Sequence, residues 1–162
     1  MIELLLIAAP LDEPQPAAPC EGAAHVQVFE EHRIVGFLGR LDECTVDILI
    51  EAFDAYESVK WFNIASTGGD HREAMRLARA IKDRKLIVHV TSFCLSACAH
   101  FAILGGRYIL ISESGYLAYS GNFLGRSLNP TLTNSLNARG VGNFNEITTE
   151  IVDFYREMDV DP

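Results

Sequence analysis

The stretches that decide the fold are Thr67-Gly68-Gly69-Asp70 and Cys94-Leu95-Ser96-Ala97-Cys98. Each ends an apolar run, 61–65 and 86–90, and each precedes apolar residues at helical spacing. Two strand-to-helix turns built of small residues therefore lie one β-α-β unit apart. Paired glycines let backbone N–H groups approach a ligand closely, and a serine at the start of a helix can present its hydroxyl to the same ligand.

The rest of the sequence alternates between the periods of strands and helices. We predict strands over 25–29, 33–38, 60–65, 86–90, 107–111 and 115–119, and helices over 43–59, 70–84, 96–104, 131–138 and 145–158, with Asp70 as a helix cap. The repeated strand-helix-strand order implies right-handed crossovers. It therefore predicts an α/β fold with a mostly parallel sheet flanked by helices.

The composition is that of a globular protein. The 162 residues suffice for one domain with a core, and 49% of them are hydrophobic. Residues 1–22 are typical of an apolar start and a proline-rich linker, which leaves 23–162 as a single domain. The net charge of −9 argues against nucleic acid and anionic membrane surfaces as partners, because both attract clustered Lys and Arg. The apolar run 2–9 is too short to span a bilayer.

Together, the Ser-x-Gly-Gly motif at 66–69 and the Cys-x-Ser-Ala-Cys motif at 94–98 resemble the Clp-protease/crotonase superfamily. The resemblance covers roughly residues 25–120 and is nearest to exported bacterial Clp-protease-like proteins with a Cys-Ala-Ser-Ala-Cys motif. It implies repeated ββα units and self-association into a homo-oligomer. Family members continue beyond the point where this sequence stops, so the resemblance also implies a truncated C-terminus.

The resemblance assigns roles to residues of the two motifs. Ser96 takes the position of the nucleophile. The backbone N–H groups of Gly68 and Ala97 take the positions of the oxyanion hole, and Gly69 supports the loop. In other acyl-transfer enzymes, each rigid amide donor aimed at the oxyanion is worth about 3–4 kcal/mol. The alternative is that Ser96 only caps its helix, as serine often does.

The histidine of the family's catalytic site has no counterpart here. The stretch that matches its Leu-Gly-Phe-His pattern is Leu117-Ala118-Tyr119-Ser120, so Ser120 stands in the histidine position. His71, directly after the Gly-Gly-Asp turn, is the better substitute base, whereas we interpret His100 as a core histidine. The triad is therefore predicted to be incomplete.

The four cysteines, Cys20, Cys44, Cys94 and Cys98, are too few for a disulfide framework of this size. We interpret Cys94 and Cys98 as buried free thiols, with a disulfide and a metal site as alternatives. A fourth zinc ligand is missing beside these two cysteines and His100. We therefore predict no metal and no cofactor.

These observations favour a degenerate Clp-protease-like serine hydrolase homologue that binds a peptide or partner protein with weak or no peptidase activity. Loss of a triad member typically removes about 10⁴-fold or more of the rate. Two alternatives stay open: an active serine peptidase that uses Ser96 with His71, and a crotonase-type enzyme that binds acyl-CoA.

Two compartments stay open for the protein. The run 2–9 resembles the end of a signal-peptide core, but it contains Glu3, and no basic residue precedes it. The resemblance to exported proteins favours the periplasm, and the cytoplasm is the alternative.

Overall fold

The computed structural model describes residue 20 and residues 24–119 and 144–160. The predicted linker, apart from Cys20, lies outside the described residues. The same holds for the predicted helix at 131–138 and for Ser120.

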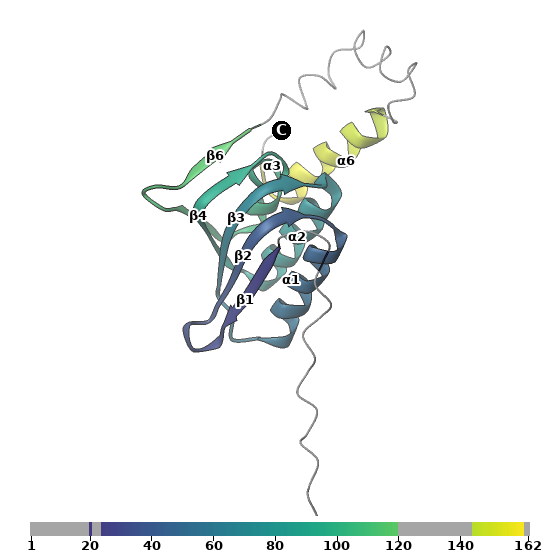
Figure 1. Cartoon of the computed structure of the whole chain (residues 1–162). Coiled ribbons are helices and arrows are strands. Elements are labelled where there is room, and N and C mark those ends of the chain that lie inside the picture. The colour runs from purple at the N-terminus through teal and green to yellow at the C-terminus, as the bar shows by residue number, and fades with distance from the viewer. Residues whose placement is uncertain (1–19, 21–23, 120–143, 161–162) are drawn as a thin grey trace, which may run out of the picture.

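A six-stranded sheet forms the centre of the molecule (Figure 1). Its strands are β1 (His25–Phe29), β2 (Ile34–Leu41), β3 (Trp61–Gly69), β4 (Ile87–Leu95), β5 (Tyr108–Ile111) and β6 (Tyr116–Ala118). The order is β1-β2-β3-β4-β5, and β6 pairs with the last part of β4. The β1–β2 hairpin is antiparallel, and the pairs that β3, β4, β5 and β6 form are parallel.

One helix each follows β2, β3 and β4 along the chain, and a fourth described helix comes after β6. They are α1 (Glu43–Ala55), α2 (His71–Arg84), α3 (Ala97–His100) and α6 (Phe144–Glu157), with 3₁₀ turns at Glu30–His32 and Ala102–Gly105. Figure 1 shows α1 and α2 on one side of the sheet. The prediction of an α/β fold with a mostly parallel sheet flanked by helices is confirmed.

Side-chain caps fix where α1 and α2 begin. Asp42 and Thr45 form a reciprocal capping box at α1. At α2, the predicted cap Asp70 accepts the N–H groups of Arg72 and Glu73 at 2.8 and 3.1 Å. Each such cap stabilises a helix by about 1 kcal/mol. The Asp70 cap places the first turn of α2 directly after the Gly68-Gly69 turn.

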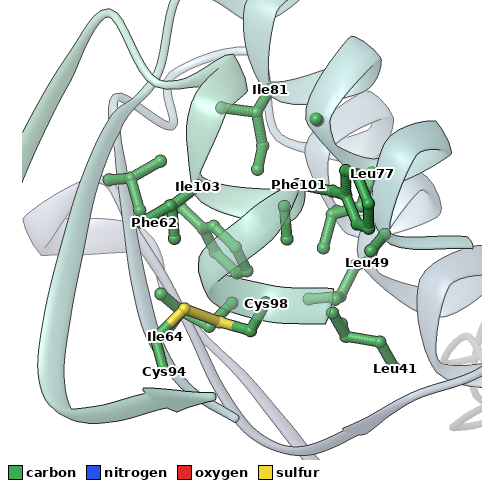
Figure 2. Packing of buried hydrophobic residues seen from close by; sticks show 14 of the residues in the cluster. Leu41, Leu49, Phe62, Ile64, Leu77, Ile81, Cys94, Cys98, Phe101 and Ile103 are labelled. Carbon is green, nitrogen blue, oxygen red and sulfur yellow. A yellow bond between two sulfur atoms is a disulfide. The ribbon is translucent and has the colours of Figure 1, made fainter. Parts of the chain in front are cut away.

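The hydrophobic core lies between the sheet and the helices (Figure 2). Phe62 and Ile64 of β3 are fully buried, as are Leu49 of α1 and Leu77 of α2. Burying a side chain of this kind stabilises the fold by about 1.5–3 kcal/mol. The core also contains Cys94 and Cys98, so it extends to the second turn.

The single helix predicted over 96–104 is interrupted. Helix α3 ends at His100, and Phe101 has φ −132° and ψ −59° before the 3₁₀ turn begins. The Phe101 side chain is buried and meets the Phe154 ring of α6 edge-on, with 5.8 Å between the ring centroids. We attribute the interruption to this packing, which outweighs the weak preference of a small-residue segment for a continuous helix.

Candidate active site

Ser96 forms a sharp turn between β4 and α3. Its backbone angles are φ 51° and ψ −123°, a combination that residues with a side chain rarely adopt. The Ser96 N–H donates to the Ala118 carbonyl at 2.8 Å, and the Ser96 carbonyl accepts the His100 N–H at 2.9 Å. A strained serine at a strand-to-helix turn is the arrangement that exposes a nucleophilic hydroxyl at the top of a sheet.

The hydroxyl of Ser96 does not cap α3. Ser96 has the position of the N-cap residue, but no hydrogen bond joins its side chain to the first turn of that helix. The interpretation of Ser96 as a helix cap is therefore wrong.

Gly68 lies against this turn. A Cβ atom at Gly68 would be 2.5 Å from the Leu95 carbonyl oxygen and 3.0 Å from both the Ala97 nitrogen and the Ser96 Cβ. Gly68 also has φ +85°, a conformation that favours glycine. The two stretches are therefore in contact.

Gly69 meets a different neighbour. A Cβ atom there would be 1.9 Å from the Leu41 carbonyl oxygen, at the end of β2. The Asp70 N–H donates to the same carbonyl at 2.8 Å. Gly69 thus lets β2 and β3 close together directly before the α2 cap, which is a supporting position for the loop.

Ser66 is a neighbour of the site that the sequence did not single out. It is fully buried, and its Oγ accepts the Gly68 N–H at 3.1 Å. An oxyanion bound by this N–H would have to share it with Ser66. Ser66 is the first residue of the Ser-x-Gly-Gly motif, and this is the feature of the sequence that could have pointed to it.

All four cysteines form disulfides, so the interpretation of Cys94 and Cys98 as free thiols is wrong. Cys94 is bonded to Cys98 with 5.3 Å between their Cα atoms, and Cys20 to Cys44 with 5.8 Å. Cys94 lies in a strand rather than on the helix of Cys98, and the turn between them brings the two together. The Cys94–Cys98 bond is buried in the core and encloses Ser96 in a short covalent loop (Figure 2).

His71 is the first residue of α2 and is partly buried. Its ring lies near that of Phe101, with 6.5 Å between the centroids. In the sequence, Ser96 directly precedes α3 and Phe101 directly follows it. The structure thus places His71 next to the segment that follows the serine turn.

His100 is packed among aromatic rings, as a core histidine should be. The Tyr119 ring is 5.0 Å away and the Phe101 ring 5.8 Å away, between centroids. Burial lowers the pKa of His100 below its usual 6.5, because it disfavours the charged imidazolium. Its Nε2 is buried and has no hydrogen-bond partner among the described residues.

The described part of the chain has neither a metal-ligand cluster nor a membrane-spanning helix. It contains no group of three or more His, Cys, Asp or Glu residues that could hold a metal ion. None of its helices combines the length and apolar character that crossing a membrane requires. The position of Ser120 relative to Ser96 lies outside this part.

Comparison with known proteins gives only distant similarities. No family model matches the chain, and no curated protein does. The catalytic domain of ClpP protease from Plasmodium falciparum is 12% identical with a TM-score of 0.45, over 78% of this chain and 68% of that one. A protein assigned as an enoyl-CoA hydratase from Streptomyces coelicolor A3(2) is 12% identical with a TM-score of 0.42, over 68% of this chain. This chain spans about half (52%) of that protein's length.

Proposed function

We propose that this chain is a Clp-protease-like serine hydrolase homologue that binds a peptide or partner protein at the Ser96 turn with weak or no turnover. The supporting observation is the contact between the strained Ser96 turn and Gly68. A strained residue persists only where its surroundings over-determine it, and such residues cluster at functional sites. Backbone N–H groups beside a hydroxyl suit a peptide carbonyl.

Weak turnover is the expectation because two parts of the machinery are compromised. By resemblance, Ser120 replaces the histidine that would act as general base, and His100 is packed into an aromatic cluster. The Gly68 N–H is shared with Ser66 Oγ, which weakens any oxyanion hole built on it. The Ser96 hydroxyl would then remain a poor nucleophile.

A fluorophosphonate probe tests this proposal. We expect Ser96 to label at least about 10³-fold more slowly than the serine of a complete triad measured in parallel. Ser96→Ala is the matched negative variant, and Ser114→Ala, at an exposed position after β5, is the control. Rapid labelling that Ser96→Ala abolishes would disprove the proposal that the Ser96 site has weak or no turnover.

Peptide binding needs a separate measurement. A fluorescent peptide library should bind the wild-type chain and lose about tenfold or more in affinity with Ser96→Tyr, which fills the site. The same substitution at Ser114 should leave affinity unchanged. Equal binding by both variants would exclude the Ser96 turn as the peptide site.

The active-peptidase alternative rests on His71. It follows the turn directly and lies beside Phe101. If His71 is the base, His71→Gln should abolish peptide hydrolysis, because the Ser96 hydroxyl would lose its proton acceptor. Hydrolysis that survives His71→Gln removes this alternative.

The acyl-CoA alternative uses the same amide groups to hold an enolate. It predicts that acetyl-CoA raises the unfolding temperature. No shift at saturating acetyl-CoA would remove it.

We further propose that the protein works in an oxidising compartment, the periplasm or outside the cell, with the cytoplasm as the alternative. The two disulfides support this, because such bonds are rare in reducing cytoplasm. Thiol alkylation of protein recovered from each compartment distinguishes the two. Four reactive thiols in the functional form would contradict export.

A further inference from the structure

A pocket lies at the opposite end of the sheet from Ser96. Its volume is about 550 Å³, within the range of small-molecule sites. Lys85 of its lining precedes β4 and Arg107 precedes β5, whereas Ser96 follows β4. Because β4 and β5 are parallel, the pocket is at their amino ends and is separate from the serine turn.

The lining of this pocket is basic in an acidic protein. The whole chain has 13 Lys and Arg against 22 Asp and Glu, yet Lys82, Lys85 and Arg107 line the pocket against one carboxylate, Asp159. Lys82 is already engaged, because its Nζ donates to the Glu157 carbonyl and lies 3.3 Å from the Asp159 carboxylate. Lys85 and Arg107 form no ion pair within the described residues.

The backbones of the two segments that carry Lys85 and Arg107 are in contact. The Arg107 N–H donates to the carbonyl of Leu86, the residue after Lys85, at 2.8 Å. Gly105, two residues before Arg107, lies against α2: a Cβ atom there would be 1.9 Å from the Ala78 carbonyl oxygen. The turn therefore packs closely against α2, the helix that Lys85 follows.

Two left-handed residues border the pocket. Lys85 has φ 54° and Asp159 φ 60°, in a region where glycine or asparagine is favoured. Lys82 and Lys85 also lie where cations stabilise a helix carboxyl end, which is their structural role. Arg107 belongs to no helix; its guanidinium lies over the Tyr108 ring, 5.5 Å from the ring centroid, which leaves its N–H donors without an ion pair among the described residues.

Part of the pocket lining is apolar. Leu104 contributes to it, and so does Met158, with 6% of its surface exposed. Cations and apolar side chains in one lining suit a ligand that carries an anionic group on a hydrocarbon group. A free phosphate could pair with the cations of this lining but would leave its apolar side chains without a partner.

We propose that this pocket binds a carboxylate attached to an aliphatic group, with the carboxylate at Lys85 and Arg107 and the aliphatic part over Leu104 and Met158. A fatty acid and the carboxyl-terminal residue of a peptide share this chemistry. The proposal is independent of any hydrolase activity at Ser96.

Calorimetric titration of the full chain tests the proposal with four probes: octanoate, octanol, inorganic phosphate, and an acetylated tripeptide ending in leucine with a free carboxylate. We expect octanoate or the peptide to bind, and octanol and phosphate to bind at least about tenfold more weakly. Octanoate alone would identify a free acid as the source, and the peptide alone a peptide terminus. Failure of both, or equal binding of octanol, would overturn the proposal.

Variants locate the site. Lys85→Gln with Arg107→Gln should lower affinity by about tenfold or more, while Lys60→Gln with Arg40→Gln, an equal charge change at exposed positions elsewhere, should leave it unchanged. Lys85→Asn is a second test that suits the left-handed backbone and so preserves folding. Unchanged affinity in the folded Lys85→Asn and Arg107→Gln variants would overturn the assignment.

Discussion

The two halves of β4 have opposite surroundings. At its carboxyl end, Cys94 and Cys98 are fully buried and disulfide-bonded, and Gly68 lies against the Ser96 turn. Beside its amino half, every residue of β5 is exposed: Tyr108 57%, Ile109 40%, Leu110 44% and Ile111 47%. Among the described residues, covalent and steric constraints are concentrated at the serine turn, whereas the apolar strand β5 is exposed along its whole length. Such a strand is a site for contact with another surface.

Gly68→Ala should produce the largest effect at the constrained end. The new methyl would clash with the Leu95 carbonyl in a backbone conformation that disfavours it, so we expect the free energy of unfolding to fall by about 3 kcal/mol. Urea denaturation measures this. The matched control is Gly36→Ala, where the nearest atom would be 3.5 Å away, and which should be neutral or slightly stabilising. Equal stability of the two variants would show that the contact at Gly68 is loose.

Removing the disulfide by Cys94→Ala with Cys98→Ala should cost about 2 kcal/mol of stability, because it closes only a short loop. It should also lower the residual fluorophosphonate labelling of Ser96. Cys20→Ala with Cys44→Ala opens a longer loop and should cost about 3 kcal/mol while leaving the labelling unchanged. Unchanged labelling in the first variant would mean that the bond does not position the serine.

At the uncovered end, Ile109→Ser with Ile111→Ser should alter assembly more than folding. Both side chains are partly solvated, so we expect a stability change below about 1 kcal/mol. If β5 supports a homo-oligomer, sedimentation should show the variant dissociating at concentrations where the wild type is assembled. Leu38→Ser, at a side chain 46% exposed on β2, is the control. A monomeric wild type would contradict the homo-oligomer that the family resemblance implies.

The smallest effect should come from His100. Its pKa is lower in the folded state than the usual 6.5, so the unfolded chain binds the proton more readily. Its contribution to stability is therefore complete above pH 6.5 and is lost as the pH falls through the folded-state pKa. His100→Gln should flatten the acidic limb of a stability-against-pH curve recorded beside that of the wild type. An acidic limb identical to that of the wild type would show that His100 does not carry it.

The sequence predicted the fold better than the site. Apolar spacing predicted α2 and the starts of β3 and β4 to within one residue, because burial of one face imposes a period that is readable locally, but both strands continue beyond their apolar runs, to Gly69 and Leu95. The Ser96 conformation was not readable, because the turn packs against Gly68, which is distant in sequence. The Cys94–Cys98 bond was missed for a local reason: the prediction placed both cysteines on one helical turn, whereas Cys94 lies in β4 and the Ser96 turn brings the two Cα atoms to 5.3 Å. The Ser66–Gly68 hydrogen bond depends on burial that a motif alone does not reveal.

Helix α6 is held in place by two kinds of contact, ion pairs with α2 and burial of its own apolar side chains. Arg72 pairs with Glu150 at 3.0 Å and Arg79 with Glu157 at 2.9 Å, but these exposed pairs are worth at most about 1 kcal/mol each and are screened by salt. Ile151 and Phe154 are buried, and each contributes about 1.5–3 kcal/mol independently of ionic strength. We therefore expect α6 to stay packed against the rest of the molecule at high salt concentration.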